Sequence, residues 1–192
     1  MMLYFKYIRF FFLKGFLFMQ NKLMYSGKFL EIYEDEYDNG KTLLKWERCS
    51  RKKNTKAVMI VPYHISKEKY LMIQEFRVPI KDYEIGFPAG LIEENENIED
   101  AIRRELKEES GLNLVSISEI SPFTYSSSGM TDEAVAIAFV NVDGEVSDKF
   151  LESSENIIPM LVSSDEINKL MKLPDLKWGS KAWLICKYIK EN

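Results

Sequence analysis

The distribution of apolar residues predicts strands over much of the chain after Tyr25. Residues 29–37 and 42–49 are rich in strand-forming side chains and flank the Asn39-Gly40 pair. Asn-Gly between two such runs is typical of the tight turn of a β-hairpin. The pattern therefore predicts a hairpin near the start of the chain.

A near-continuous apolar run covers residues 57–65 and predicts a strand that is buried on both faces. His64, the only histidine, lies inside this run, so it is interpreted as a strand residue rather than a metal ligand. A strand over residues 70–76 is expected to pair with the run. Further strands are expected over residues 83–87, 114–120, 133–142 and 160–162.

A helix is predicted between Asn97 and Gly111. Asn97 suits the N-cap, and Gly111 suits the left-handed position after the last turn. The apolar residues between them recur at helical spacing and form one stripe, which consists of Ile98, Ala101, Ile102 and Leu106.

Two shorter helices are expected near the end of the chain. One covers residues 164–172 and is stopped by Pro174, and the other runs from Trp178 or Gly179 to Lys190. The apolar side of the last helix is predicted to carry Trp183, Leu184 and Tyr188. Strands with one central helix and terminal helices indicate an α+β fold or an α/β/α sandwich.

The composition is that of an ordinary globular protein. The chain has 192 residues, which suits one domain with a small appendage, and its net charge is −4. This balance gives no general attraction to nucleic acid. Cys49 and Cys186 lie far apart in the sequence, and they have neither metal-type spacing nor a disulfide framework. A reducing, cytoplasmic location is therefore expected.

Residues 1–19 are aromatic and apolar, but Lys6, Arg9 and Lys14 interrupt them. Charges near the centre of an apolar segment disfavour a spanning helix, so stable membrane insertion is not expected. Three interpretations remain: translated upstream sequence with initiation at Met19 or Met24, a membrane-surface segment, or an extension that packs in a dimer. We favour the first.

The predicted central helix carries a candidate metal site. Glu105 and Glu109 are four residues apart and therefore lie on one face, with Glu108 beside them. Hard divalent cations prefer oxygen ligands that a rigid element holds. A solvated acidic helix face is the alternative interpretation of these three residues alone.

The full spacing around these glutamates resembles the Nudix box. Gly90 is followed after five residues by Glu96, and after seven more by Arg-Glu-Leu-Lys-Glu-Glu-Ser-Gly-Leu, which covers residues 104–112. The resemblance implies a Nudix fold with a mixed central sheet, an α/β/α sandwich, and a Mg²⁺-dependent or Mn²⁺-dependent hydrolase that holds two or more ions.

Roles for individual residues follow from the same resemblance. Glu105 and Glu109 are expected to bind metal, with Glu108 assisting and the backbone carbonyl of Ala89 joining them. Gly90 would allow a tight turn beside the metals, and Glu96 and Arg104 would anchor the loop to the helix. Gly111 would close the helix.

Four further stretches resemble the ADP-ribose pyrophosphatases within this family. They are residues 25–29, 74–77, 88–91 and 127–133. The resemblance implies that Arg77, Gly129 and Met130 bind substrate. Arg51 lies in a basic loop that is either a solvated turn or a further contact to a substrate phosphate. Two positions depart from the pattern: Ser128 replaces a proline that marks ADP-ribose specificity, and Gly86 replaces a glutamate before Pro-Ala-Gly.

The expected reaction is hydrolysis of ADP-ribose or a related nucleoside diphosphate sugar to a nucleotide and a sugar phosphate. The general base is expected on an acidic loop, with Glu155 preferred and Glu152 second. GDP-mannose, NADH, a modified nucleotide, or a non-catalytic regulatory role are the alternatives. Residues 1–24 are interpreted as an extension, residues 25–55 as a hairpin arm that exchanges in a homodimer, and residues 56–192 as the Nudix domain.

Overall fold

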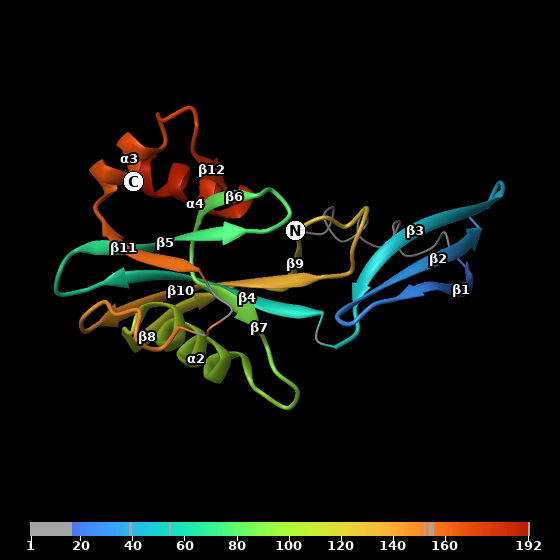
Figure 1. The fold of residues 1–192 in the computed structure, drawn as a ribbon, viewed down its shortest axis with the longest axis horizontal. Helices are drawn as coiled ribbons and strands as arrows, with labels where there is room; N and C mark the ends of the chain where they lie inside the picture. The colour runs from blue at the N-terminus through green and yellow to red at the C-terminus, as the bar shows by residue number, and fades with distance from the viewer. Residues whose placement is uncertain (1–16, 39, 54, 152, 154–155, 192) are drawn as a thin grey trace, which may run out of the picture. The chain divides into compact units, whose positions relative to one another are not determined.

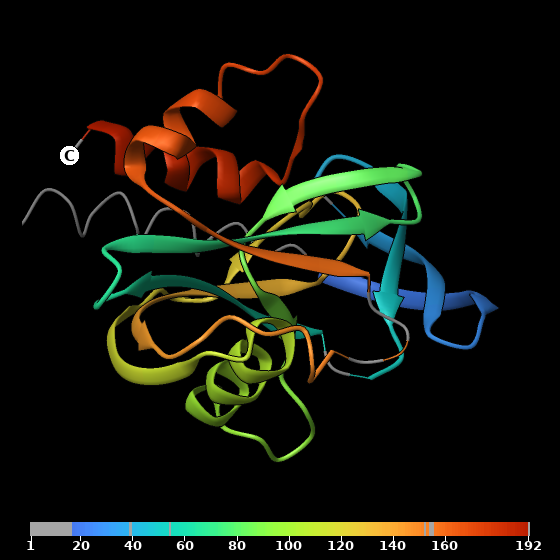
Figure 2. The ribbon, with the colours of Figure 1, turned by 60° about the vertical axis from the view of Figure 1, so that its left-hand side comes forward.

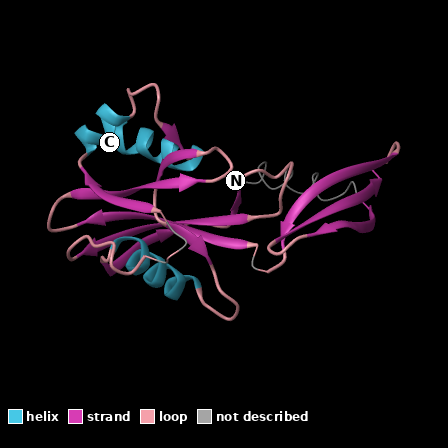
Figure 3. Cartoon of the chain, in the orientation of Figure 1, coloured by secondary structure: helices cyan, strands magenta, loops and turns pink. Residues whose placement is uncertain are grey.

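A computed structural model describes residues 17–38, 40–53, 55–151, 153 and 156–191 (Figure 1). It divides into two compact units. The first contains the described residues up to Thr55 together with residues 125–133, and the second contains residues 56–124 and 134–192. Strands predominate in both, as the magenta arrows of Figure 3 show.

The first unit is an antiparallel sheet in the order β1-β2-β3. Its strands are β1 (Leu17–Ser26), β2 (Leu30–Asp38) and β3 (Leu43–Arg51). Asp38 pairs with Leu43, and Gly40 has a φ of 80° between them, so the predicted hairpin is confirmed. The expectation that strand structure begins at Tyr25 is wrong, because residues from Leu17 onward already pair with β2.

The second unit is built on a larger mixed sheet with the central order β12-β6-β5-β4-β10-β8. Strands β11, β7 and β9 pair with β5, β4 and β10, respectively. The bounds are β4 (Lys56–His64), β5 (Lys69–Arg77), β6 (Asp82–Gly86), β7 (Ala89–Leu91), β8 (Asn113–Ile120), β9 (Thr124–Tyr125), β10 (Ala134–Asp143), β11 (Ile157–Val162) and β12 (Lys177–Trp178). Every strand predicted for this part of the chain is present.

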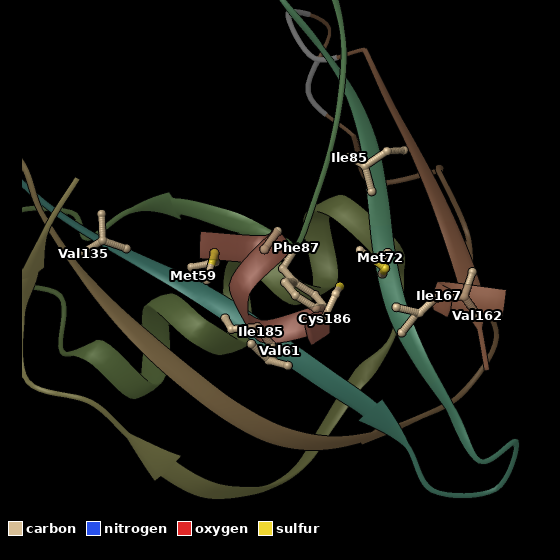
Figure 4. Close-up of a cluster of buried hydrophobic side chains, with 11 residues drawn as sticks. Met59, Val61, Met72, Ile85, Phe87, Val135, Val162, Ile167, Ile185 and Cys186 are labelled. Atoms are coloured by element: carbon tan, nitrogen blue, oxygen red, sulfur yellow. The ribbon is translucent and has the colours of Figure 1, made fainter. Parts of the chain in front are cut away.

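Strand β4 has a hydrophobic core on each of its faces, as its apolar run predicted. Val58 and Ile60 face one core, whereas Met59 and Val61 face the other. All four side chains are buried, and full burial of such a side chain contributes roughly 1.5–3 kcal/mol. Figure 4 shows the second of these clusters, which includes Met59, Val61 and Phe87.

Helices cover both faces of this sheet (Figures 1 and 2). Helix α2 (Ile98–Ser110) contributes to the core that contains Val58 and Ile60, whereas α3 (Ser164–Leu170) and α4 (Ser180–Glu191) contribute to the opposite core. The unit is therefore an α/β/α sandwich of the α+β class, as predicted.

The predicted apolar side of α4 is wrong. Trp183, Leu184 and Tyr188 are exposed, whereas Ala182, Ile185 and Cys186 face the core. Ile185 is as large as Leu184, so the packing of the helix and not the size of the side chain decides which of them is buried. Gly179 precedes the helix and its carbonyl accepts the Trp183 N–H, while Trp178 belongs to β12.

Two further expectations have clear outcomes. His64 ends β4 and is buried, and its Nε2 lies 2.9 Å from the carbonyl oxygen of Gly144, so it is a strand residue as expected. Cys49 and Cys186 are both free thiols. Within the described part of the chain, no helix combines the length and the apolar character that crossing a membrane requires.

Candidate active site

Helix α2 is fixed at both ends by the residues that the sequence predicted. The Asn97 side chain accepts the Asp100 backbone N–H at 2.9 Å. Gly111 has a φ of 74°, and its N–H donates to the Lys107 carbonyl oxygen at 2.9 Å. Because a side chain is strained at that φ, glycine is the residue that closes this helix most easily.

Glu105 and Glu109 point from α2 into the protein beside β7. Their exposed fractions are only 7% and 2%. The Ala89 backbone N–H donates to Glu109 Oε2 at 3.2 Å. A Cβ at position 90 would lie 1.7 Å from Glu105 Oε1, so only glycine leaves room for that carboxylate. Two carboxylates one helical turn apart therefore meet the backbone of residues 89–90.

Arg104 organises the carboxylates around the start of α2. Its Nε and Nη2 donate to the two oxygens of Glu96, each at 2.9 Å. Hydrogen bonding with Glu96 is the main cause that raises the pKa of Arg104, and burial partly opposes it. The same hydrogen bonding holds the pKa of Glu96 below its usual value. Arg104 Nη2 also donates to the Leu91 carbonyl oxygen at 2.9 Å, which ties the loop to the helix.

The three box glutamates do not converge on one point. Arg104 Nη1 donates to Glu105 at 2.7 Å and to Glu108 at 3.1 Å, and Glu108 is more exposed than Glu105. Within the described residues, no group of three or more Asp, Glu, His or Cys side chains is arranged to hold a metal ion. Mg²⁺ uses few protein carboxylates and completes its shell with water and substrate phosphates. Two buried carboxylates beside an open glycine backbone fit that requirement.

Arg77 lies at the end of β5 in the second unit. Its Nη1 contacts Glu75 at 2.6 Å, and its Nε lies 3.8 Å from Glu84. Glu75 and Glu84 are directly opposed on β5 and β6. Like charges in that position repel, so the guanidinium stabilises the pair. At Gly86, which ends β6, a Cβ would meet no atom within 4 Å, so this position accommodates a larger residue without a clash.

The other predicted substrate-binding residues come together in the first unit. The Met130 carbonyl accepts the Cys49 N–H at 2.9 Å, and the Gly129 carbonyl accepts the Trp46 indole N–H, also at 2.9 Å. Arg51 Nε donates to Glu133 Oε2 at 2.6 Å. The loop over residues 126–133 is thus joined to β3 at several points.

Two charged residues of this unit, Arg48 and Asp35, could not be recognised as interacting residues from the sequence. Arg48 donates to Asp35 at 2.6 Å and lies 3.2 Å from Asp132. Asp35 stands in an acidic stretch of β2, so its burial is not apparent from the sequence. The strand alternation around it is the only signal that distinguishes it from Glu34 and Glu36.

Glu152 and Glu155, the predicted bases, lie outside the described residues. Leu151 and Asn156 flank that segment, and the Asn156 carbonyl accepts the Phe76 N–H at 3.1 Å. Asn156 therefore lies beside the end of β5, which also carries Arg77.

Comparison with known protein families agrees with the arrangement of Gly90, Glu105 and Glu109 around α2. The family model described as the NUDIX domain matches residues 53–184, so the chain belongs to the Nudix hydrolase family. The match includes the whole stretch from Gly90 to Leu112.

Two individual proteins are also similar to this chain in sequence. An ADP-ribose pyrophosphatase of Bacillus subtilis (strain 168) is 27% identical over 84% of this chain and 86% of its own length. An ADP-sugar pyrophosphatase of Mus musculus is 31% identical over 65% of this chain and 60% of its own length. A crystal structure of an ADP compounds hydrolase has a TM-score of 0.70 at 21% identity, covering 93% of this chain and 96% of that one, which supports the fold.

Proposed function

We propose that the protein hydrolyses the pyrophosphate bond of ADP-ribose or a related nucleoside diphosphate sugar, releasing a nucleotide and a sugar phosphate. The observation that carries the proposal is the burial of Glu105 and Glu109 against the backbone at Gly90. The two relatives are named for ADP-ribose and ADP-sugar hydrolysis, which supports this choice of substrate class.

Nudix hydrolases generally require a divalent cation, and Mg²⁺ or Mn²⁺ is proposed here, with two or more ions. Glu105, Glu109 and the Ala89 carbonyl oxygen would hold the cation, and Glu108 would assist. A bound cation neutralises phosphoryl oxygens and lowers the pKa of a bound water. Arg104 keeps the carboxylates of Glu105 and Glu108 in place through its hydrogen bonds.

The remaining roles are assigned to residues outside the box. Glu155, with Glu152 as the second choice, would accept a proton from the attacking water. Arg77, whose Nη1 contacts Glu75 at 2.6 Å, would bind a substrate phosphate. Arg51, Gly129 and Met130 would contact the substrate.

We further propose a homodimer in the cytoplasm. Large apolar side chains are exposed on the first unit, including Tyr25, Phe29 and Leu30. A second copy of the same unit is a partner of matching chemistry. The free thiols of Cys49 and Cys186 are consistent with a reducing compartment.

A substrate panel tests the proposed reaction. We expect turnover of ADP-ribose in Mg²⁺ and none in EDTA, with slower turnover of GDP-mannose, NADH and deoxynucleoside triphosphates. Release of the nucleotide and the sugar phosphate is followed by chromatography. Absence of turnover of every compound with metal present would overturn the enzyme assignment.

A matched pair of variants tests the metal ligands. Glu109→Gln removes a buried charge and is expected to lower kcat/KM by about 100-fold or more, because removing even an outer partner of a ligand costs roughly 10–100-fold. Glu99→Gln makes the same charge change at an exposed position of α2 and is expected to retain activity. Circular dichroism checks folding, and near-native activity of Glu109→Gln would place the metal elsewhere.

A further inference from the structure

Helix α4 is apolar on two sides, but the core of the second unit covers only one of them. Ile185 and Cys186 belong to that core. Trp183, Leu184 and Tyr188 are exposed by 42%, 62% and 65%, respectively. Large apolar side chains that lie together in water are unfavourable, and such a patch commonly marks an interaction site. The outer side of α4 is therefore a candidate binding surface.

The exposed residues of α4 form one continuous face. Residues four apart on a helix lie one above the other, so Trp183 is beside Lys187, and Leu184 is beside Tyr188. Leu184 and Lys187 are three residues apart, so these two rows are neighbours. Lys187 is itself exposed. The face thus combines two aromatic rings and a leucine with a positive charge.

The chain around α4 is basic, although the whole chain is acidic. Residues 169–190 contain one acid, Asp175, and six lysines, which gives a net charge of +5 against −4 for the whole chain. Asp165 and Glu166 precede this segment in α3, and Lys69 contacts Glu166 at 3.2 Å. Helices α3 and α4 pack against each other over one face of the larger sheet (Figure 2). Their charges therefore attract an anionic partner.

The size and chemistry of this face fit a lipid surface better than a second copy of the chain. A stable protein interface takes about 20–30 residues from each side, whereas this face offers three large apolar side chains. Two copies would also bring their lysines together. Tryptophan and tyrosine favour the boundary between lipid headgroups and acyl chains, because their rings are apolar and their polar atoms stay hydrated. Lysines beside them are attracted by anionic lipids.

We propose that the exposed face of α4 attaches the protein to an anionic membrane surface. The helix lies in the plane of that surface, where Trp183, Leu184 and Tyr188 enter the boundary between headgroups and acyl chains. Lys187 contacts the lipid phosphates. The opposite side of α4 stays in the core, so attachment needs no unfolding. None of these residues is a proposed metal ligand or substrate contact, so attachment leaves the proposed reaction unchanged.

Co-sedimentation of the full-length chain with vesicles tests the attachment. We expect binding to vesicles of phosphatidylcholine and phosphatidylglycerol in equal parts, and weaker binding to phosphatidylcholine alone. Trp183→Ser with Leu184→Ser should lower the binding constant by about 10-fold or more, because it removes the inserted apolar area. Lys187→Gln should lower it by about 5-fold. Val115→Ser with Ile65→Ser changes two exposed residues of the same unit outside α4 and should bind normally.

Tryptophan fluorescence identifies the residue that enters the lipid. The emission of Trp183 is expected to shift to shorter wavelength when the anionic vesicles are added, because its ring leaves water. Trp183→Phe keeps an aromatic ring at this position, so it should retain binding but lose the shift. The chain has three tryptophans, and the other two, Trp46 and Trp178, remain in this variant. A shift that persists in Trp183→Phe would place the inserted surface elsewhere and overturn the proposal.

Further outcomes would also overturn the attachment through α4. One is the absence of binding to the anionic vesicles by the unmodified protein. Another is unchanged binding after Trp183→Ser with Leu184→Ser, since residues 1–19 are intact in every variant and would then hold the lipid. A change from dimer to monomer in that variant, measured by sedimentation velocity, would show that a second copy covers this face. If the variant does not fold by circular dichroism, Lys187→Gln and Trp183→Phe still decide the question.

Discussion

At the scale of single residues, Gly90 is the described glycine at which an added Cβ would come closest to another atom, Glu105 Oε1 at 1.7 Å. A Cβ there would lie within 2.3 Å of both carboxylate oxygens of Glu105. Since Glu105 is buried and is held by Arg104 at 2.7 Å, its carboxylate cannot move freely. The glycine is therefore required by its neighbour in space, not by its own φ.

Gly90→Ala is expected to displace the Glu105 carboxylate and to lower kcat/KM by about 10-fold or more, because small misplacements of catalytic groups are costly. Overpacking should also reduce the free energy of unfolding by roughly 1–3 kcal/mol. Gly86→Ala, where a Cβ meets nothing within 4 Å, is the matched control. Equal activity of both variants would contradict the steric argument.

At the scale of elements, α4 shows how packing sets which face of a helix is buried. Ile185 and Cys186 face the core, and burial raises the pKa of the Cys186 thiol to about 12. Trp183 and Leu184 stand outside. The apolar residues are spread around the whole helix, so the sequence alone offered two possible buried faces.

Two neighbouring substitutions distinguish these faces. Ile185→Ala is expected to lower the free energy of unfolding by about 2–5 kcal/mol, because it leaves a cavity in the core. Leu184→Ala should change it by less than about 0.5 kcal/mol, as is usual for exposed positions. Urea denaturation measures the free energy of unfolding of both variants, provided that their m-values are equal. A larger loss of this free energy in Leu184→Ala than in Ile185→Ala would show that the helix is buried on the opposite face.

At the scale of the whole molecule, the family match covers residues 53–184 and leaves the whole three-stranded sheet of the first unit outside it. The unit that contains this sheet exposes large apolar residues, among them Leu23, Met24 and Phe29. Contiguous exposed apolar surface commonly marks an interaction site. A homodimer through this unit remains a prediction.

Sedimentation velocity at micromolar concentration is expected to give the mass of a dimer. Met24→Ser combined with Phe29→Ser should weaken the dimer, because it removes apolar area from the proposed interface. Val115→Ser with Leu173→Ser changes two similarly exposed residues of the second unit and should leave the mass unchanged. A monomer in the unmodified protein would refute the prediction.

Features that depend on near neighbours in the chain could be predicted from the order of the amino acids. The helix between Asn97 and Gly111, the hairpin at Gly40 and the two-sided burial of β4 follow from capping, turn chemistry and apolar runs. The spacing from Gly90 to Leu112 also identified the family, because it is a property of the chain alone.

Which distant residues meet became clear only from the folded structure. The pairing of β7 with β4 fixes residues 89–90 beside Glu105 and Glu109, and α4 presents Ile185 rather than Leu184 to the core. Asp35 looks like its acidic neighbours in sequence, yet Arg48 and the loop residues enclose it. These contacts join segments far apart in the chain, so they depend on the packing of the whole unit and not on local preference.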